Sequence, residues 1–315
     1  MNTPAATPAL TVLHLSDLHA RSDGPLYGVI DAPARVRRIA AVAEGAQIAP
    51  DAIVVTGDLV DHADRAAYPP VADALEELST ALDAPVLAVP GNHDAPEFEA
   101  DLSNHPALRR HRLDVGPWRL LGLDTGAGDL AATELGTLRR ALSEPHRTGT
   151  ILVMHHSPVA SPLPSLRGIG LHRPEALGGL IAGSDVRAVL CGHYHHALSA
   201  QFAGVPVWVG PALSYAQIMD AGAGQVQGQD VAGFSVVRLD AAGATATPYP
   251  LASRPPLFTV AAGSKTGRPT PPGPPAPRSS PPETRSSPQT HPSTAHPHDP
   301  HIPITQITPK KTQKG

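Results

Sequence analysis

The chain of 315 residues, 41% of them hydrophobic, is long enough to form one large α/β domain or two small ones. Residues 261–315 hold seven of the 24 Lys and Arg residues against only Glu283 and Asp299. The rest of the chain is therefore acidic, which argues against a general nucleic-acid binder. No apolar run approaches the roughly 18 residues of a membrane span. The first residues also lack a secretory signal, so we expect no membrane span and a cytoplasmic location.

Strands and helices are predicted to alternate over most of the chain, because short apolar runs alternate with stretches of helical periodicity. The predicted strands cover 9–16, 51–57, 84–91, 119–126, 149–156 and 186–193, and the predicted helices cover 31–46, 70–82, 131–144 and 173–183. The early strand–helix–strand order calls for a largely parallel sheet with right-handed crossovers. After Cys191, hairpin-like segments at 197–210 and 233–251 predict a second sheet, mixed or antiparallel.

The composition changes near residue 255. Residues 255–315 hold 16 of the 37 prolines and few side chains that a core could bury, so we expect a disordered, basic, Pro-rich tail there. Residues 1–254 would then form the folded domain. The PPxPPxP run of the tail is typical of polyproline ligands and could bind an unknown partner, although a plain extended tail is the simpler interpretation.

Polar side chains of one chemical kind follow the predicted strands. In open α/β sheets, ligands collect at the carboxyl ends of the strands, so residues far apart in the sequence can converge there. Carboxylate and amide oxygens mixed with imidazoles suit Mn, Fe or Zn and not a thiolate site, so the lone Cys191 is expected to be a buried strand residue. The candidates are Asp17, His19, Asp58, Asn92, His93, His155, His193 and His195.

Local spacing supports this set of candidates. Asp17 and His19 lie two residues apart directly after a strand, as do His193 and His195, and alternate residues there point the same way. A glycine precedes the candidates at three of the strand ends and allows a tight backbone. The pair at 155–156 is different, because adjacent residues of a strand or helix cannot aim both rings at one point. We therefore expect only one of these two histidines at the site.

The motifs DLH, GDLVD, GNHD, HH and GHYH occur in this order over residues 10–215, and the set is similar to the calcineurin-like metallophosphoesterase superfamily. The segments GPLYGVIDAPARVRRI, GDLVDHADRAAY and DVRAVLCGHYHHALSAQFAGVPVWVGPALSY further resemble the class III bacterial cyclic nucleotide phosphodiesterases. The resemblance implies a four-layer α/β/β/α sandwich of two mixed sheets with a dinuclear metal centre at the strand ends. It also makes residues 1–254 a metallophosphoesterase domain.

The resemblance implies two ligand sets that share one carboxylate. One metal ion would be held by Asp17, His19, Asp58 and His195, and the other by Asp58, Asn92, His155 and His193, with Asp58 bridging the two. The ions would be divalent or mixed-valence Fe, Mn or Zn. They would activate a water between them for in-line attack on phosphorus and supply the positive charge that the acidic domain lacks. The first histidine of the pair matches the ligand position, and His156 would support the loop.

The resemblance also implies catalytic and substrate-binding residues. Asn92 and His93 would contact the substrate, and His93 would protonate or stabilise the leaving oxygen with Asp94 as its orienting partner. Asp61 stands where purple acid phosphatases carry a tyrosine ligand, so a coloured tyrosinate-iron site is not expected. His14, inside the first strand, has no such role and is expected to be a hydrogen-bonded sheet histidine.

The expected activity is that of a phosphodiesterase that opens 3′,5′-cyclic AMP, and also cyclic GMP, to the 5′-monophosphate. The alternative substrates are 2′,3′-cyclic nucleotides, glycerophosphodiesters or aryl phosphodiesters. A catalytically idle metal-binding scaffold is a third hypothesis, against which the intact ligand set argues. Residues 157–177 are expected to face the substrate, with Arg167 and His172 either as phosphate or base contacts or as solvated loop residues. Related phosphodiesterases imply a homodimer.

Overall fold

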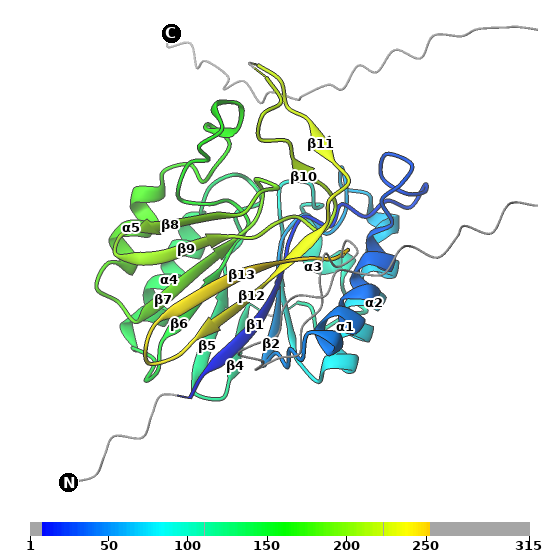
Figure 1. The fold of residues 1–315 in the computed structure, drawn as a ribbon. Coiled ribbons are helices and arrows are strands. Elements are labelled where there is room, and N and C mark those ends of the chain that lie inside the picture. Colours follow the sequence, from blue (N-terminus) through cyan, green and yellow to red (C-terminus); the bar gives the residue numbers. More distant parts are fainter. Residues whose placement is uncertain (1–7, 110, 223, 253–315) are drawn as a thin grey trace, which may run out of the picture. The chain divides into compact units, whose positions relative to one another are not determined.

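The computed structural model describes residues 8–109, 111–222 and 224–252 (Figure 1). The predicted tail over 255–315 lies outside these residues, so the predicted domain boundary stays a prediction. The strands are β1 (Leu10–Leu15), β2 (Ala52–Thr56), β3 (Val86–Val89), β4 (Arg112–Val115), β5 (Trp118–Gly122), β6 (Thr150–Val153), β7 (Val186–Cys191), β8 (Leu198–Phe202), β9 (Val205–Val209), β10 (Ala216–Gln217), β11 (Gly228–Gln229), β12 (Gly233–Leu239) and β13 (Ala244–Pro250). The helices are α1 (Ala32–Gly45), α2 (Tyr68–Leu82), α3 (Phe98–Asp101), α4 (Ala132–Ser143) and α5 (Pro174–Ile181), with short 3-10 helices at Arg65–Ala67 and Pro164–Leu166. Among the described helices, none has the length and apolar character needed to cross a membrane.

The strands form two mixed sheets and one short ribbon. The five-stranded sheet has the order β13-β12-β1-β2-β3, with β1, β2 and β3 parallel and with β12 and β13 antiparallel at one side. The six-stranded sheet has the order β4-β5-β6-β7-β9-β8, with antiparallel strands β4 and β8 at its two edges. The parallel strands β1, β2 and β3, joined through α1 and α2, confirm the predicted strand–helix–strand unit.

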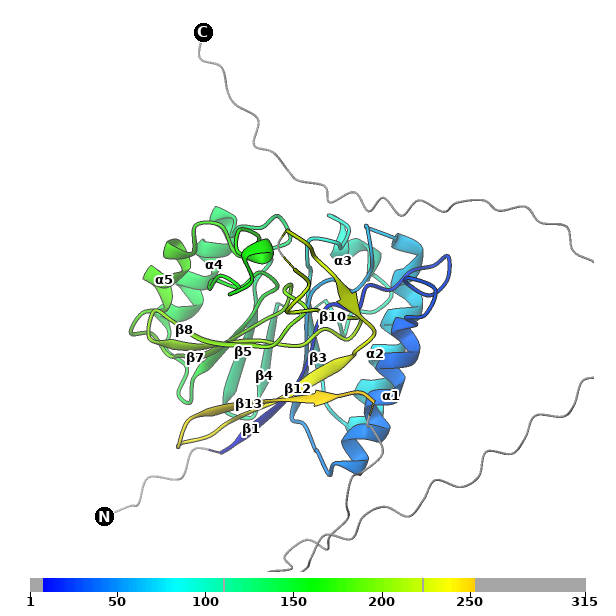
Figure 2. The same cartoon turned by 45° about the horizontal axis from the view of Figure 1, so that its top comes forward.

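Alternate residues of the central strands face different cores. In β1, Leu13 and Leu15 pack with residues of α1 and α2, whereas Leu10 and Val12 face the second sheet. In β7, Val189 packs with residues of α4 and α5. Figures 1 and 2 show α1 and α2 on one side of the paired sheets and α4 and α5 on the other. The predicted four-layer α/β/β/α sandwich of two mixed sheets is therefore confirmed.

The second, mixed sheet predicted from the segments after Cys191 is present, but it contains only the first of the two hairpin segments. That sheet already begins with β4, a strand that the sequence did not predict, and each later hairpin extends an existing sheet. The β8–β9 hairpin turns at Ala203 and Gly204, whose φ angles of 50° and 83° are typical of a two-residue turn between antiparallel strands, and β9 then pairs with β7. The β12–β13 hairpin joins β1 in the other sheet.

Candidate metal centre

Loops at the carboxyl ends of β1, β2, β3, β6 and β7 supply the candidate residues. The loops after β1 and β2 hold each other, because the backbone N–H of Asp17 donates to the carbonyl of Gly57 (3.1 Å) and that of His19 to the carbonyl of Asp58 (2.9 Å). The N–H of His193, after β7, donates to both carboxylate oxygens of Asp17, at 3.1 Å each. Residues from both sheets therefore meet at one point, as the strand-end argument predicts.

The backbone at this point is strained. Five of the seven predicted metal ligands have φ angles in the left-handed region, which costs a residue other than glycine about 1–3 kcal/mol. These residues are Asp17 (54°), His19 (50°), Asp58 (52°), His193 (76°) and His195 (51°). Such strain persists only where the surrounding structure enforces it, and its concentration in one place is typical of a functional site. The residue types at these positions did not predict this strain.

Asp17, His19 and His195 form the first donor group. One donor atom from each of the three lies within 4.8 Å of the other two. Nε2 of His195 is 3.4 Å from Oδ1 of Asp17 and 3.1 Å from Nε2 of His19. All three side chains are buried, with His195 the most exposed at 6%.

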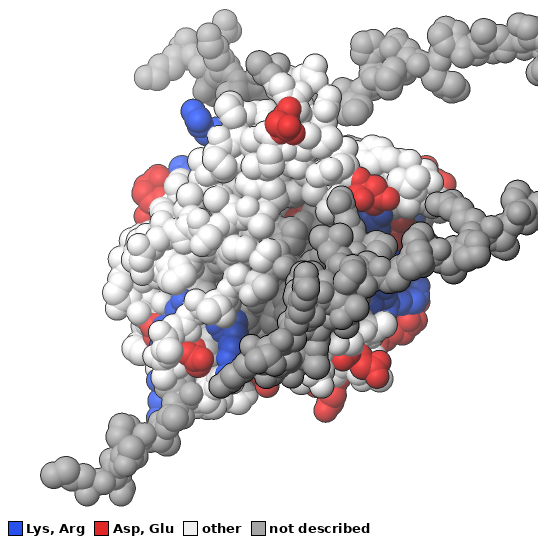
Figure 3. Space-filling model, viewed as in Figure 1, with Lys and Arg blue, Asp and Glu red and all other residues white. Residues whose placement is uncertain are grey.

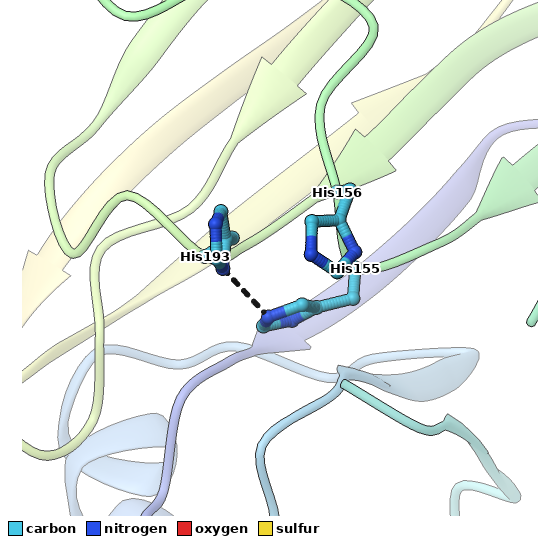
Figure 4. Close-up of side chains that lie close together, drawn as sticks. All are labelled: His155, His156 and His193. Atoms are coloured by element: carbon cyan, nitrogen blue, oxygen red, sulfur yellow. Dashed lines mark hydrogen bonds between the residues drawn. The ribbon is translucent and has the colours of Figure 1, made fainter. Parts of the chain in front are cut away.

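The second donor group surrounds His155. Its Nε2 lies 3.4 Å from Oδ2 of Asp58, 3.0 Å from Oδ1 of Asn92 and 3.0 Å from Nδ1 of His193. Figure 4 shows the contact between the two histidines. Oδ2 of Asp58 is also 3.4 Å from Nε2 of His19, which belongs to the first group. Asp58 therefore lies between the two groups.

The donor atoms fit bound cations. Nδ1 of His195 donates to the carbonyl of Tyr215 (3.0 Å), and Nδ1 of His19 is 3.3 Å from Oδ1 of Asp61. If both rings are neutral, their Nε2 atoms then present lone pairs to each other at 3.1 Å, an arrangement that a cation between them stabilises. Nε2 of His193 is buried and has no hydrogen-bond partner among the described residues. Deprotonated donors held from behind in this way are what a divalent ion requires.

The carboxylate of Asp58 and the buried imidazoles around it shift one another's pKa values. Burial by itself would raise the pKa of Asp58, but His155 and His19 outweigh it and hold the pKa of that carboxyl well below its usual range. Burial would lower the pKa of His155, whereas the charge of Asp58 raises it to about 9. Burial lowers the pKa of His195 to about 4 and that of His193 well below its usual value. Asp58 is thus an ionised carboxylate among imidazoles, of which His193 and His195 are neutral.

His156 lies closer to the donor groups than predicted. Strand β6 ends at Val153, so the two adjacent histidines do not lie on an extended strand. One nitrogen from each of His155, His156 and His193 lies within 4.8 Å of the others, and Figure 4 shows the three rings together. The expectation that only one ring of the pair faces the site is therefore wrong. Nδ1 of His156 is 3.2 Å from Oγ1 of Thr125, which ties this loop to the segment after β5, as expected of a loop support.

Asp61, and not Asp94, is the carboxylate partner of His93. Nδ1 of His93 is 2.9 Å from Oδ1 of Asp61. The predicted role of Asp94 is therefore corrected, because its oxygens accept hydrogen bonds from other donors and fasten the loops after β2 and β3. These donors are the backbone N–H groups of Gly91 (2.8 Å), Leu59 (3.2 Å) and Val60 (3.2 Å) and the hydroxyl of Tyr68 (3.1 Å). The available sequence signal for Asp61 was its position three residues after Asp58.

Gly91 is required by the close approach of the loops after β2 and β3. A Cβ at this position would lie 2.5 Å from the backbone nitrogen of Asp58 and closer still to its carboxylate. We expect Gly91→Ala to lower the free energy of unfolding by about 1–3 kcal/mol and to weaken metal retention. Gly179→Ala, in α5, is the matched control, because no atom lies within 4 Å of the added Cβ and alanine favours the helix. Denaturant unfolding and metal content check both; equal stability of the two variants would contradict the close packing.

The remaining predicted residues lie around this site or apart from it. His14 is buried and its Nε2 is 2.9 Å from Oγ1 of Thr56, which confirms a hydrogen-bonded sheet histidine. Cys191 is buried in β7, as predicted. Arg167 and His172 are exposed, and neither side chain has a hydrogen bond within the described part of the chain. Their contacts with substrate stay predictions.

The sequence profile of the calcineurin-like phosphoesterase family matches residues 10–197, the stretch that holds all of these donors. The chain is 35% identical over 242 residues to the cAMP/cGMP dual specificity phosphodiesterase of Mycobacterium tuberculosis, covering 71% of this chain and 73% of that protein. It is 32% identical over 208 residues to a 3′,5′-cyclic adenosine monophosphate phosphodiesterase of Pseudomonas aeruginosa, covering 64% and 75% of the two chains.

Among solved structures, GAP50, the anchor in the inner membrane complex of Plasmodium, is similar in fold. It gives a TM-score of 0.55 at 14% identity and covers 77% of this chain and 85% of its own. The family profile, by contrast, spans more than half of the sequence and includes every donor of the two groups. The chain therefore belongs to the calcineurin-like phosphoesterase family of metal-dependent hydrolases.

Proposed function

We propose that this chain hydrolyses 3′,5′-cyclic nucleotides, cAMP and cGMP, to the 5′-monophosphates. The names of the relatives from M. tuberculosis and P. aeruginosa support this substrate class. The observation that carries the proposal is the position of His93. Its side chain is 29% exposed, whereas those of His19 and His155 are 3% and 0% exposed. His93 is therefore an accessible imidazole at the edge of a buried donor cluster, where a substrate can reach it.

The donor cluster would hold two ions of Fe, Mn or Zn. The proposed ligands of one ion are Asp17, His19, Asp58 and His195, and those of the other are Asp58, Asn92, His155 and His193. When bound, the ions supply Lewis-acid polarisation of the phosphate and water of lowered pKa as the nucleophile. The carbonyl of Tyr215 and the carboxylate of Asp61 orient the imidazoles from behind, so that their Nε2 atoms point inward.

His93 completes the reaction at the leaving group. Its backbone N–H donates to Oδ1 of Asp58 (2.8 Å), and its ring is held at Nδ1 by Asp61. The Nε2 atom is therefore the one that faces the substrate. When the oxygen of water bonds to phosphorus and the bond from phosphorus to O3′ breaks, Nε2 of His93 gives O3′ a proton. Asn92 and His93 together contact the phosphate, and the product is the 5′-monophosphate.

Turnover of a substrate panel tests this assignment. The panel contains 3′,5′-cyclic AMP and GMP, 2′,3′-cyclic AMP, glycerophosphodiesters and bis(p-nitrophenyl) phosphate, assayed with added Mn. We expect kcat/KM to be highest for a 3′,5′-cyclic nucleotide. A higher value for a glycerophosphodiester or a 2′,3′-cyclic nucleotide would replace the proposed substrate class by the alternative one. Lack of turnover by protein that contains two ions per chain would support an idle scaffold.

Removal of the metal should abolish hydrolysis and also loosen the fold. The carboxylates of Asp17 and Asp58 lie close together, and so do the facing lone pairs of the imidazoles. Bound ions would compensate the repulsion between these groups. We expect dialysis against a chelator to eliminate turnover and to lower Tm, and stoichiometric Mn to restore both. Elemental analysis and thermal unfolding follow the two effects. Full turnover by protein that contains less than a tenth of an equivalent of metal would contradict the proposal.

A further inference from the structure

The loop after β1 presents an exposed aromatic side chain on a fixed base. Leu26 and Ile30 are buried, at 3% exposure each, and their backbones bond to each other (2.9 and 3.0 Å). Between them, Tyr27 is 66% exposed and Val29 is 63% exposed. Tyr27 also has a φ angle of 52°, which is unfavourable for a bulky residue. Holding this ring in solvent therefore costs free energy in two ways, because an apolar surface is exposed to water and because the backbone at Tyr27 is strained.

A row of aromatic rings joins Tyr27 to the donor groups. The ring of Tyr215 lies 4.2 Å from that of His195 and 5.7 Å from that of Tyr27, measured between centroids, and the two tyrosines meet edge to face. Tyr215 is fixed in place, because its carbonyl accepts the hydrogen bond from Nδ1 of His195. Arg35 of α1 donates to the carbonyl of Ser214 beside it. The exposed ring of Tyr27 therefore stands next to the metal centre, one ring beyond Tyr215.

We infer that Tyr27 stacks on the base of the bound nucleotide and that Tyr215 forms the wall between this base site and the metal centre. The inference rests on the proposed function, because the phosphate must lie at the donor groups for the base to reach Tyr27. Aromatic rings stack on any nucleobase through its π face, which suits an enzyme that accepts both adenine and guanine. Tyr27 would thus be a specificity-determining residue for nucleotides over phosphodiesters without a base.

The ribbon of β10 and β11, which follows Tyr215 in the chain, exposes apolar side chains. In Figure 3, the surface over β10 and β11 shows mostly uncharged side chains. The exposed large hydrophobic residues of this ribbon and its flanks are Met219, Val226 and Val231, at 44–51% exposure. The phosphate would be bound at the donor groups, so the part of the nucleotide that reaches the aromatic ring of Tyr27 would be the base. Phosphate and base also lie at opposite ends of a nucleotide.

Tyr27→Ala tests the inference with two pairs of ligands that differ only in the base. The first pair is cAMP and ribose 3′,5′-cyclic phosphate as substrates, and the second is AMP and ribose 5-phosphate as competitive inhibitors of the metal-loaded enzyme. We expect Tyr27→Ala to raise KM for cAMP and Ki for AMP by about 5- to 100-fold, the range for loss of one stacked ring. KM and Ki for the two ligands without a base should change less than 2-fold, and kcat should be kept.

Two control variants separate stacking from a change in the loop. Tyr27→Phe keeps the ring and should retain KM for cAMP, and Val29→Ala removes an equally exposed apolar side chain from the same loop and should leave KM unchanged. Three results would each overturn the inference. The first is an equal rise in KM or Ki for ligands with and without a base, and the second is an equal rise in Val29→Ala and Tyr27→Ala. The third is a smaller oligomer in sedimentation that accompanies the rise. If wild-type protein hydrolyses cAMP while Tyr27→Ala keeps all constants, only the stacking role fails. If wild-type protein does not hydrolyse cAMP, the proposed function fails.

Discussion

Asp58→Ala is expected to remove both metal ions and to lower kcat by about 10³-fold or more. Oδ2 of Asp58 is 3.4 Å from Nε2 of His19 and 3.4 Å from Nε2 of His155, so this carboxylate serves both donor groups. Its other oxygen accepts the backbone N–H of His93 (2.8 Å). A proposed ligand of one ion only, such as His195, lacks this double role. Loss of the bridging group should therefore exceed the effect of any single-ion ligand.

Metal content per chain and turnover, measured on the same preparations, check this prediction. Asp58→Asn keeps the volume and removes only the charge, so it should lose both ions as well. Asp185→Asn is the matched control, because the Asp185 side chain is only 10% exposed, pairs with Arg119 (3.0 Å) and lies outside both donor groups. It should lower Tm while both ions remain. An Asp58 variant with two ions per chain and normal turnover would contradict the bridging assignment.

The layered fold was predictable because burial on both faces leaves a clear mark in the sequence. Strands such as β2 and β6 are continuous apolar runs, and α1 and α2 separate the parallel strands at regular distances. Strand β4 carries no such mark, since two of its four residues, Arg112 and Asp114, are exposed and charged. The sequence also does not predict which sheet a late hairpin joins. The pairing of β9 with β7 and of β12 with β1 depends on contacts between segments that are distant in the chain.

The donor set was predictable for a similar reason, since parallel strands bring their carboxyl ends together. Partnerships between side chains were not. Asp94 adjoins His93 in the sequence, yet its carboxylate bonds to the backbone of the loop after β2, while Asp61 of that loop bonds to His93. Proximity in the sequence indicated the wrong partner for His93, because each of the two loops supplies a carboxylate that bonds to the other loop. Asp94, after β3, bonds to the loop after β2, and Asp61, after β2, bonds to His93. The left-handed φ angle of Asp58 (52°) was likewise not predicted.

His93→Ala is expected to keep both ions and to lower kcat on cAMP by about 10²- to 10⁴-fold, the range for a lost general acid. The retention of metal follows from geometry. His93 is more exposed than the buried histidines, and it contacts Asp58 through its backbone N–H, which the substitution preserves. The lower kcat follows from the loss of the proton that the departing O3′ needs.

A substrate with a better leaving group separates proton donation from other roles. The nitrophenolate of bis(p-nitrophenyl) phosphate is a stable anion that needs little protonation as it departs. His93→Ala should therefore lose far less activity on this substrate than on cAMP. His62→Ala is the matched control, because its ring lies 4.9 Å from that of His93 but its side chain is 77% exposed, and it should change kcat less than about 3-fold on either substrate. If His93→Ala retains two ions but loses kcat equally on both substrates, the acid role is ruled out and His93 instead binds the phosphate. Loss of the ions would instead make His93 a support of the Asn92 loop.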